Sequence, residues 1–383
     1  MKRLTFLFLA VLAPLSLSQQ VCAQGGATPN YYEELCFEGS NQFNEGFGAL
    51  KSMGLWVFID KDGNMPFGMA YEQVKAFSCG RASVKHGGKW GYIDKSGAKV
   101  ADFIYDKAMN FEKSYGAVCQ DGRWGLIDMN GSVIVPLQYD HVYMWSDGDV
   151  AIVEQDDKYG IFDLATKKLT FNAYSHNILS FSEGLASVAD SRDLFKQKHG
   201  FIDKNGKVVI PFKYEDAKGF TEGLAAVKTG GKWGFIDKTG RQVIACKYES
   251  VCDFSNGLAS VTLNGKAGLI DKTGKVVVPL QFQEVGRPFH GYAYFWRDEK
   301  VGVIDLKGNV VVDAVYDALK MSETDGLVAV RKGGKFGFVD MSGKVVVPII
   351  FSAVSEFSEG FASVKLGNNC GIIDTKGRVL MPR

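Results

Sequence analysis

A tandem repeat of about 34 residues governs the chain from residue 37 onward. One aspartate marks each copy, and the steps between successive aspartates are 34, 34, 35, 40, 34, 34, 34, 35 and 34 residues. A glycine stands three residues before and three residues after the aspartate in nine of ten copies each. A short unit repeated in this way cannot bury its own apolar surface, so it must stack on its neighbours. The ten aspartates are Asp60, Asp94, Asp128, Asp163, Asp203, Asp237, Asp271, Asp305, Asp340 and Asp374.

A second column of aromatic residues confirms this frame. An aromatic residue follows each of the first nine aspartates by eleven positions, and Phe37 holds the equivalent place ahead of the first copy. We expect most of these rings to fill the core between neighbouring copies, although a row of exposed rings would suit glycan stacking. The column consists of Tyr71, Tyr105, Tyr139, Tyr174, Tyr214, Tyr248, Phe282, Tyr316 and Phe351.

The segment 232–240, KWGFIDKTG, is the clearest copy and resembles the WG (KWG) repeat found in many bacterial proteins. The resemblance covers about residues 37–383, and it implies an interaction repeat. Residues that carry the pattern are expected to act in folding. In the three best-preserved copies they are Trp90, Gly91, Asp94, Gly97, Trp124, Gly125, Asp128, Gly131, Trp233, Gly234, Asp237 and Gly240.

Each copy is predicted to be a three-stranded antiparallel meander. Residues 224–228, 232–236 and 242–244 are short β-branched or apolar runs separated by glycine turns. Asp237 is expected to accept backbone N–H groups in a type I turn, with Gly240 at positive φ. Gly234 is expected to let neighbouring layers approach closely.

The arrangement of the copies is the harder question. Three complete strands in each copy favour an open, curved β-solenoid or superhelix. The alternative is a closed β-propeller-like ring, whose blades usually carry four strands. A fourth short strand in the aromatic connection 248–251 would favour the ring.

The N-terminal residues have the pattern of an export signal. Lys2 and Arg3 precede an apolar stretch over 4–17, and small residues before Gln24 predict a signal peptide at 1–23. Residues 24–36 form a short N-terminal segment, and 37–383 form the repeat domain of ten units. The protein is therefore expected to be periplasmic or secreted, with no membrane span in the mature chain.

Charge and motifs exclude several functions. A formal net charge of +1 gives no electrostatic drive toward nucleic acid. The five histidines fall in different copies, and no catalytic or metal motif occurs, so we expect no enzyme activity, no cofactor and no metal. Cys246 and Cys252 are the only closely spaced cysteines in the mature chain, and they form either a disulfide or two free thiols.

These features predict a non-enzymatic, exported β-repeat protein whose extended surface binds an unknown protein at the cell envelope or outside the cell. The alternative is a glycan-binding module that uses exposed aromatic residues. Two departures from the repeat supply candidate partner-binding residues: the charged insertion 189–198 and the aromatic run 292–296. The candidates are Arg192, Leu194, Phe195, Tyr292, Tyr294 and Trp296.

Overall fold

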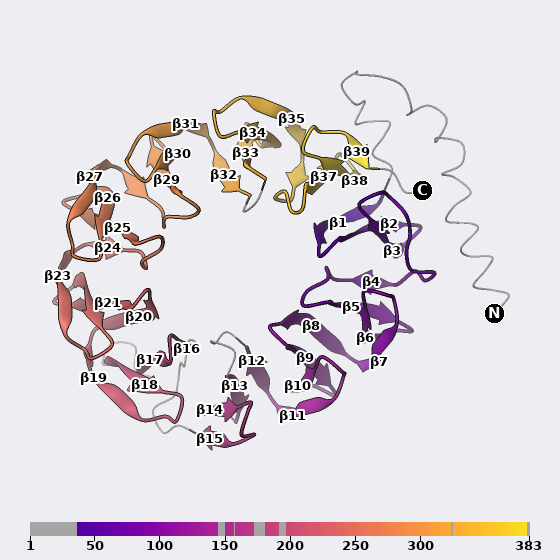
Figure 1. The fold of residues 1–383 in the computed structure, drawn as a ribbon, viewed down its shortest axis with the longest axis horizontal. Helices are drawn as coiled ribbons and strands as arrows, with labels where there is room; N and C mark the ends of the chain where they lie inside the picture. Colours follow the sequence, from indigo (N-terminus) through magenta and orange to yellow (C-terminus); the bar gives the residue numbers. More distant parts are fainter. Residues whose placement is uncertain are drawn as a thin grey trace. The chain divides into compact units, whose positions relative to one another are not determined.

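A computed structural model describes residues 37–144, 150–156, 158–171, 181–190, 197–322 and 325–380. All regular elements in these ranges are β-strands, which form ten antiparallel sheets of three or four strands (Figure 1). The predicted all-β class is therefore confirmed. The predicted signal peptide and the segment 24–36 lie outside the described residues.

The sheets are numbered here in chain order, and their strands have the following bounds. Sheet 1 has β1 (Gly39–Asn44), β2 (Phe47–Ser52) and β3 (Leu55–Asp60), and sheet 2 has β4 (Gln73–Val74), β5 (Arg81–His86), β6 (Lys89–Asp94) and β7 (Lys99–Tyr105). Sheet 3 has β8 (Lys107–Glu112), β9 (Tyr115–Gln120), β10 (Arg123–Asp128) and β11 (Val133–Tyr139). Sheet 4 has β12 (His141–Tyr143), β13 (Val150–Gln155), β14 (Lys158–Asp163) and β15 (Leu169–Phe171).

The later sheets follow the same plan. Sheet 5 has β16 (Phe181–Ser182), β17 (Leu185–Ala189), β18 (His199–Asp203) and β19 (Val208–Tyr214), and sheet 6 has β20 (Asp216–Thr221), β21 (Leu224–Thr229), β22 (Lys232–Asp237) and β23 (Gln242–Tyr248). Sheet 7 has β24 (Ser250–Val251), β25 (Leu258–Leu263), β26 (Lys266–Asp271) and β27 (Val276–Phe282), and sheet 8 has β28 (Glu284–Val285), β29 (Tyr292–Arg297), β30 (Lys300–Asp305) and β31 (Val310–Tyr316). Sheet 9 has β32 (Ala318–Met321), β33 (Leu327–Lys332), β34 (Lys335–Asp340) and β35 (Val345–Phe351), and sheet 10 has β36 (Ala353–Val354), β37 (Phe361–Leu366), β38 (Asn369–Asp374) and β39 (Val379–Leu380).

Sheet 6 shows how one copy folds. The three predicted strands appear as β21, β22 and β23, but the prediction of a three-stranded unit is wrong because a fourth strand, β20, pairs with β21. The short strand that follows the aromatic column belongs to the next sheet, as β24 does in sheet 7. Each sheet is thus a four-stranded meander of the kind found in β-propeller blades, except sheet 1, which has three strands.

The predicted turns are confirmed. Asp237 Oδ1 accepts hydrogen bonds from the backbone N–H groups of Thr239 (3.0 Å) and Arg241 (3.1 Å), and Gly240 N–H donates to the Asp237 carbonyl at 2.9 Å. Gly240 has φ of +82°. Hydrogen bonds from the side chains of Thr239 and Arg241 hold the pKa of Asp237 near 2, so the turn is charged at neutral pH.

Gly234 is required for a different reason from the one predicted. A Cβ at this position would lie 2.5 Å from the Ile244 carbonyl oxygen and 2.7 Å from the Cys246 nitrogen. Both atoms belong to β23 of the same sheet, where the pairing with β22 shifts register between Trp233 and Phe235. The close approach is therefore made to a bulged neighbouring strand within one copy, and the predicted contact between layers is wrong.

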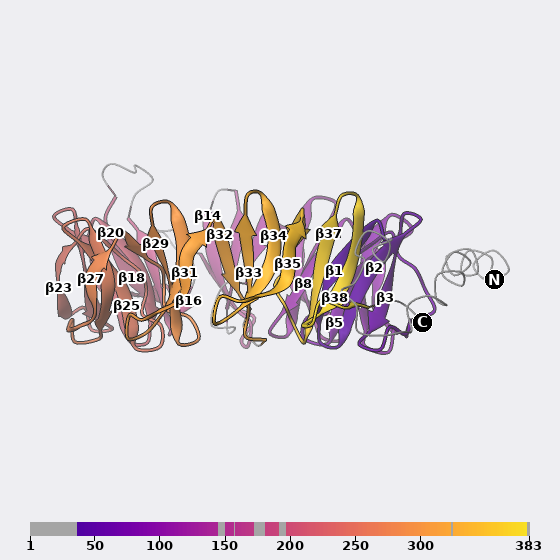
Figure 2. The ribbon, with the colours of Figure 1, turned by 90° about the horizontal axis from the view of Figure 1, so that it is seen from above.

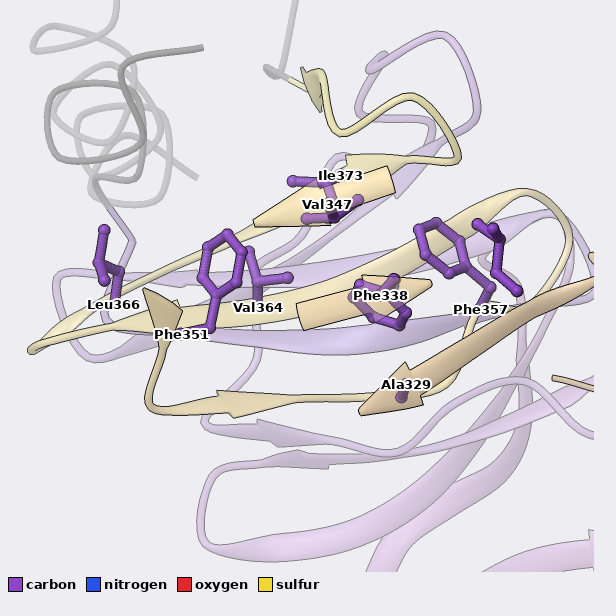
Figure 3. Close-up of a cluster of buried hydrophobic side chains, with 10 residues drawn as sticks. Ala329, Phe338, Val347, Phe351, Phe357, Val364, Leu366 and Ile373 are labelled. Carbon is purple, nitrogen blue, oxygen red and sulfur yellow. The ribbon is translucent and has the colours of Figure 1, made fainter. Parts of the chain in front are cut away.

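The chain divides into two compact units, and each has its own core. Unit 1 comprises residues 1–120, 127–132 and 318–383, and unit 2 comprises 121–126 and 133–317. In unit 1 one cluster joins sheets 9 and 10 through Phe338, Phe351, Phe357 and Ile373 (Figure 3). In unit 2 an equivalent cluster joins sheets 6 and 7. Neighbouring sheets thus bury their faces against one another, as the repeat predicts.

The aromatic column fills this core. Every column residue that the structure describes is at most 7% exposed, and Phe37 is 4% exposed. Tyr174 lies outside the described residues. The interpretation of the column as core is therefore confirmed for its described members, and none of these rings forms an exposed stacking platform.

Within unit 1 the first and last sheets are neighbours. β1 contacts β37 and β38 (Figures 1 and 2), and Phe43 and Phe361 place their ring centroids 4.6 Å apart. Phe37 also pairs with Cys370 of β38, with N···O distances of 3.1 and 2.7 Å. This pairing matches that of Tyr248 with Trp233 in sheet 6, so Phe37 supplies the column residue of sheet 10.

This contact contradicts the open solenoid and matches the closed, propeller-like alternative. Glu359 of sheet 10 accepts a hydrogen bond from Gly46 N–H of sheet 1 at 2.8 Å, and its carboxylate lies 3.1 Å from Lys61 Nζ. Glu222 of sheet 6 makes the same two contacts with the following sheet, to Gly257 N–H at 3.0 Å and to Lys272 Nζ at 3.1 Å. The last sheet therefore binds the first through the same two contacts by which sheet 6 binds sheet 7.

Candidate functional site

The candidate site is a cavity of about 570 Å³ in unit 2, between sheets 7 and 8. The turn between β25 and β26, the end of β27 and the turn between β29 and β30 provide its walls. The lining residues are Gly265, Lys266, Gln281, Phe282, Gln283, Trp296, Arg297, Asp298 and Glu299. This volume lies in the range of small-molecule sites.

The aromatic run predicted from the sequence lies on β29. Ala293 and Phe295 are buried in the core between sheets 7 and 8. Because successive side chains of a strand point to opposite faces, Tyr292, Tyr294 and Trp296 share the other face, and all three are half-buried. The rings of Tyr294 and Trp296 are 6.4 Å apart at an angle of 69°. Of these three residues, Trp296 lines the cavity.

Trp296 breaks the repeat pattern. It pairs with Val301, whereas at the same register Lys228 pairs with Trp233 in sheet 6. The anchor position has therefore lost its tryptophan in sheet 8, and an indole stands on the opposite strand instead. In sheet 6 the equivalent lysine places its Nζ 5.9 Å from the Trp233 ring centroid, so that copy carries a cation–π pair at this place.

The turn beside the cavity carries backbone strain. Asp298 and Glu299 have φ of +49° and +61°, at the positions where Gly230 and Gly231 form the tight turn of sheet 6. Left-handed φ is disfavoured for a residue with a long side chain such as glutamate. The same turn of sheet 7 has Asn264 at φ of +52° followed by Gly265 at +68°, so the departure of sheet 8 lies in its second turn residue, Glu299.

A carboxylate that caps this turn in other copies is missing here. Glu215, directly after the column aromatic, accepts hydrogen bonds from the N–H groups of Gly230 (2.9 Å) and Gly231 (2.8 Å). Glu249 does the same for the turn of sheet 7. In sheet 8 the residue at this place is Gln283. The sequence analysis missed this substitution, although the acid after the column aromatic was visible in neighbouring copies.

The charges around the cavity balance. Lys266 and Arg297 are cationic and Asp298 and Glu299 are anionic, and no ion pair joins any of them within the described ranges. Arg297 instead lies with its guanidinium 5.4 Å from the Phe295 ring centroid. The cavity therefore offers donors and acceptors of both signs without a net charge.

A second surface feature of unit 2 is a row of exposed valines, which the sequence analysis also missed. Val209, Val243 and Val277 are the second residues of β19, β23 and β27, and they are 42%, 36% and 41% exposed. Each of these strands is the last in its sheet and has an open edge. We call these three residues the valine row. Its signal in the sequence was the 34-residue spacing of valines.

Other predicted residues are placed as follows. Arg192, Leu194 and Phe195 lie outside the described residues. Cys246 and Cys252 are free thiols, so the disulfide alternative is not realised in the structure. Trp90, Trp124 and Trp233 are half-buried.

The glycines and aspartates of the other two well-preserved copies make the same kinds of contact as those of sheet 6. Gly91 and Gly125 approach the next strand of their own sheet, as Gly234 does, and Gly97 and Gly131 have positive φ. Asp94 and Asp128 accept backbone N–H groups as Asp237 does. In the part of the chain that the structure describes, no cluster of metal-ligating side chains occurs and no helix has the length and hydropathy of a membrane span.

The fold and its repeated turns define a β-propeller-like repeat protein. The chain belongs to the WG containing repeat family, whose pattern matches more than half of the chain in eight copies. The matched ranges are 56–90, 90–124, 124–159, 200–233, 233–266, 268–296, 302–336 and 336–370. The comparison with curated proteins found no match.

Three solved structures are similar to this chain at low identity. A eukaryotic initiation factor is 13% identical, with a TM-score of 0.53 over 78% of this chain and 93% of that one. Dipeptidyl peptidase 4 of Porphyromonas gingivalis is 10% identical, with a TM-score of 0.42 over 94% of this chain and 62% of that one. Hsv2p of Kluyveromyces lactis is 12% identical, with a TM-score of 0.36 over 60% and 90%. The first of these likenesses supports the fold and nothing further.

Proposed function

We propose that this chain is a non-enzymatic, exported protein that binds another protein through the outer strands of unit 2. The valine row carries the proposal. Exposed apolar side chains recur at one position on the last strands of three consecutive sheets, and exposed apolar surface on soluble proteins is typical of protein contacts.

The surroundings of the valine row suit a protein partner. Cationic residues stand in the turns that lead into the same three strands. Each lies two positions before a valine of the row, and they are Lys207, Arg241 and Lys275. Apolar residues bordered by charged residues are the usual composition of a protein interface. An open strand edge also accepts a strand from a partner through backbone hydrogen bonds.

Export and the lack of catalysis belong to the same proposal. The signal sequence at 1–23 directs the chain to the periplasm or the outside of the cell. The chain carries no catalytic motif, and the described polar residues that repeat are occupied in turns, which supports a binding role without chemistry. The net charge of +1 supports a partner other than nucleic acid.

Replacing the valine row by lysine (V209K, V243K and V277K together) should weaken partner binding by about tenfold or more, the equivalent of about 1.4 kcal/mol. Charged side chains at the valine row must lose their water when the partner covers them. The partner is first captured by a photo-crosslinking residue at position 243 in exported fractions, and its affinity is then measured by calorimetry.

The matched control carries I104K, V133K and V345K. These residues are 45%, 50% and 49% exposed on outer strands of other sheets, so the control adds the same charge at similar exposure. It should keep the affinity of the unmodified protein. Equal losses in both triple variants, or no loss in either, would rule out the valine row as the contact.

A further inference from the structure

We infer that the cavity between sheets 7 and 8 binds an uncharged sugar residue of a glycan. This inference goes beyond the proposed protein contact, because it rests on different residues and a different face of the repeats. Three departures from the repeat pattern meet at this cavity: Trp296 opposite Val301, Gln283 in place of the capping acid, and the strained Asp298-Glu299 turn. One departure alone is ordinary drift in a repeat array, but three around one cavity indicate a site.

The chemistry of the walls selects the ligand. A sugar ring presents an apolar C–H face and a rim of hydroxyl groups that both donate and accept hydrogen bonds. Trp296 supplies aromatic surface at the cavity, while Gln281 and Gln283 supply amides that each donate and accept. The carboxylates of Asp298 and Glu299 can accept hydrogen bonds from the sugar hydroxyl groups. Lys266 and Arg297 can donate hydrogen bonds to the oxygens of the same hydroxyl groups.

The charge balance argues for an uncharged ligand. Two cationic and two anionic side chains leave the cavity without the excess charge that a phosphate, a sulfate or an acidic sugar would require. The volume of about 570 Å³ holds one or two sugar rings, within the usual size of small-molecule sites.

A peptide strand fits the cavity less well. An added strand binds through the backbone groups of an open sheet edge. β26 is already paired with β25 and β27, and β29 is already paired with β28 and β30. β27 has an open edge, but it contributes to the cavity lining only its last two residues, Gln281 and Phe282, so an added strand would find little backbone to pair with there.

The test is calorimetric titration of the full chain with three neutral probes: maltotetraose, cellotetraose and N-acetylchitotetraose. Tetra-alanine serves as the peptide probe. At least one sugar should bind saturably, and W296A should weaken that binding by about tenfold or more. The matched control is R331A, which alters the exposed residue at the same position of β33 in unit 1; it should leave sugar affinity unchanged.

A second variant separates lost binding from lost folding. The combination Q283E, D298G and E299G restores the pattern of sheet 6 in sheet 8. It should raise the melting temperature, because it removes two left-handed φ values from non-glycine residues and supplies a capping carboxylate, yet it should lose sugar binding. The inference is overturned if no probe sugar binds saturably, if W296A and R331A bind alike, or if tetra-alanine binds in a Trp296-dependent way and the sugars do not. None of these results bears on the valine row.

Discussion

Replacing Phe37 by alanine should lower the free energy of unfolding by about 3–5 kcal/mol, the usual cost of deleting a fully buried phenylalanine. Phe37 lies just ahead of β1, the first strand of sheet 1. Here it is 4% exposed, and it packs with Phe43, Leu50, Ile59 and Ile372 in a cluster shared by sheets 1 and 10. Chemical denaturation of the purified chain measures the change.

Hydrogen exchange adds a local readout to the same variant. The Cys370 N–H donates to the Phe37 carbonyl at 2.7 Å, so its exchange should accelerate when the Phe37 side chain no longer anchors that segment. Phe37→Leu keeps a large apolar side chain and should recover most of the stability. A loss below about 1 kcal/mol in Phe37→Ala, with unchanged exchange at Cys370, would mean that the two ends of the repeat array do not pack together.

Gly234→Val should destabilise the chain by about 3 kcal/mol or more, because the new Cβ has no room beside the backbone of β23. Its ideal position lies 2.5 Å from the Ile244 carbonyl oxygen, 2.7 Å from the Cys246 nitrogen and 2.8 Å from the Ala245 carbonyl carbon. Backbone atoms in a paired strand cannot move aside as a flexible side chain can. Thermal and chemical unfolding of the variant test the expectation.

Gly219→Ala provides the matched control in the same sheet. A Cβ on Gly219 meets one atom within 4 Å, Ser182 Cβ at 3.7 Å, which is ordinary van der Waals contact. Its φ is not in the left-handed region, so alanine fits there at little cost. Similar stabilities for Gly234→Val and Gly219→Ala would show that the bulge of β23 does not press on Gly234.

The sequence predicts the repeated parts of this fold well because each is set by local chemistry. The aspartate and glycine of each turn, the three longer strands and the buried aromatic column all follow from residue types at fixed spacing. The fourth strand was missed because β24 is only Ser250–Val251, too short for any periodicity to appear. The structural role of Gly234 was predicted wrongly because the bulge that requires a glycine lies on the neighbouring strand, β23. The residues around Gly234 do not reveal that bulge.

Closure was predicted wrongly for a physical reason. Every copy carries the same interface residues whether its neighbours form an open or a closed array, so periodicity alone does not distinguish the two. The distinguishing sign was Phe37, an unpaired column residue ahead of the first copy, which completes sheet 10. The candidate site was found in part, because Trp296 stood out in an aromatic run where other copies have a strand of small apolar residues. The change at Gln283 can be read in the sequence, but its meaning appears only when the structure shows that the residue after the column aromatic caps the turn.

Zero-length carbodiimide cross-linking, read by mass spectrometry, tests most directly whether the first and last sheets are neighbours. The Lys61 and Glu359 side chains are 3.1 Å apart although 298 positions separate them in sequence. The pairs Lys95–Glu45, Lys238–Glu183 and Lys272–Glu222 join consecutive sheets at 3.1, 3.0 and 3.1 Å and serve as internal standards. Mixing isotopically light and heavy chains separates links within a chain from links between chains. We expect Lys61–Glu359 to link within the chain as efficiently as the three standards; efficient standards without the Lys61–Glu359 link would contradict the contact between the ends of the array.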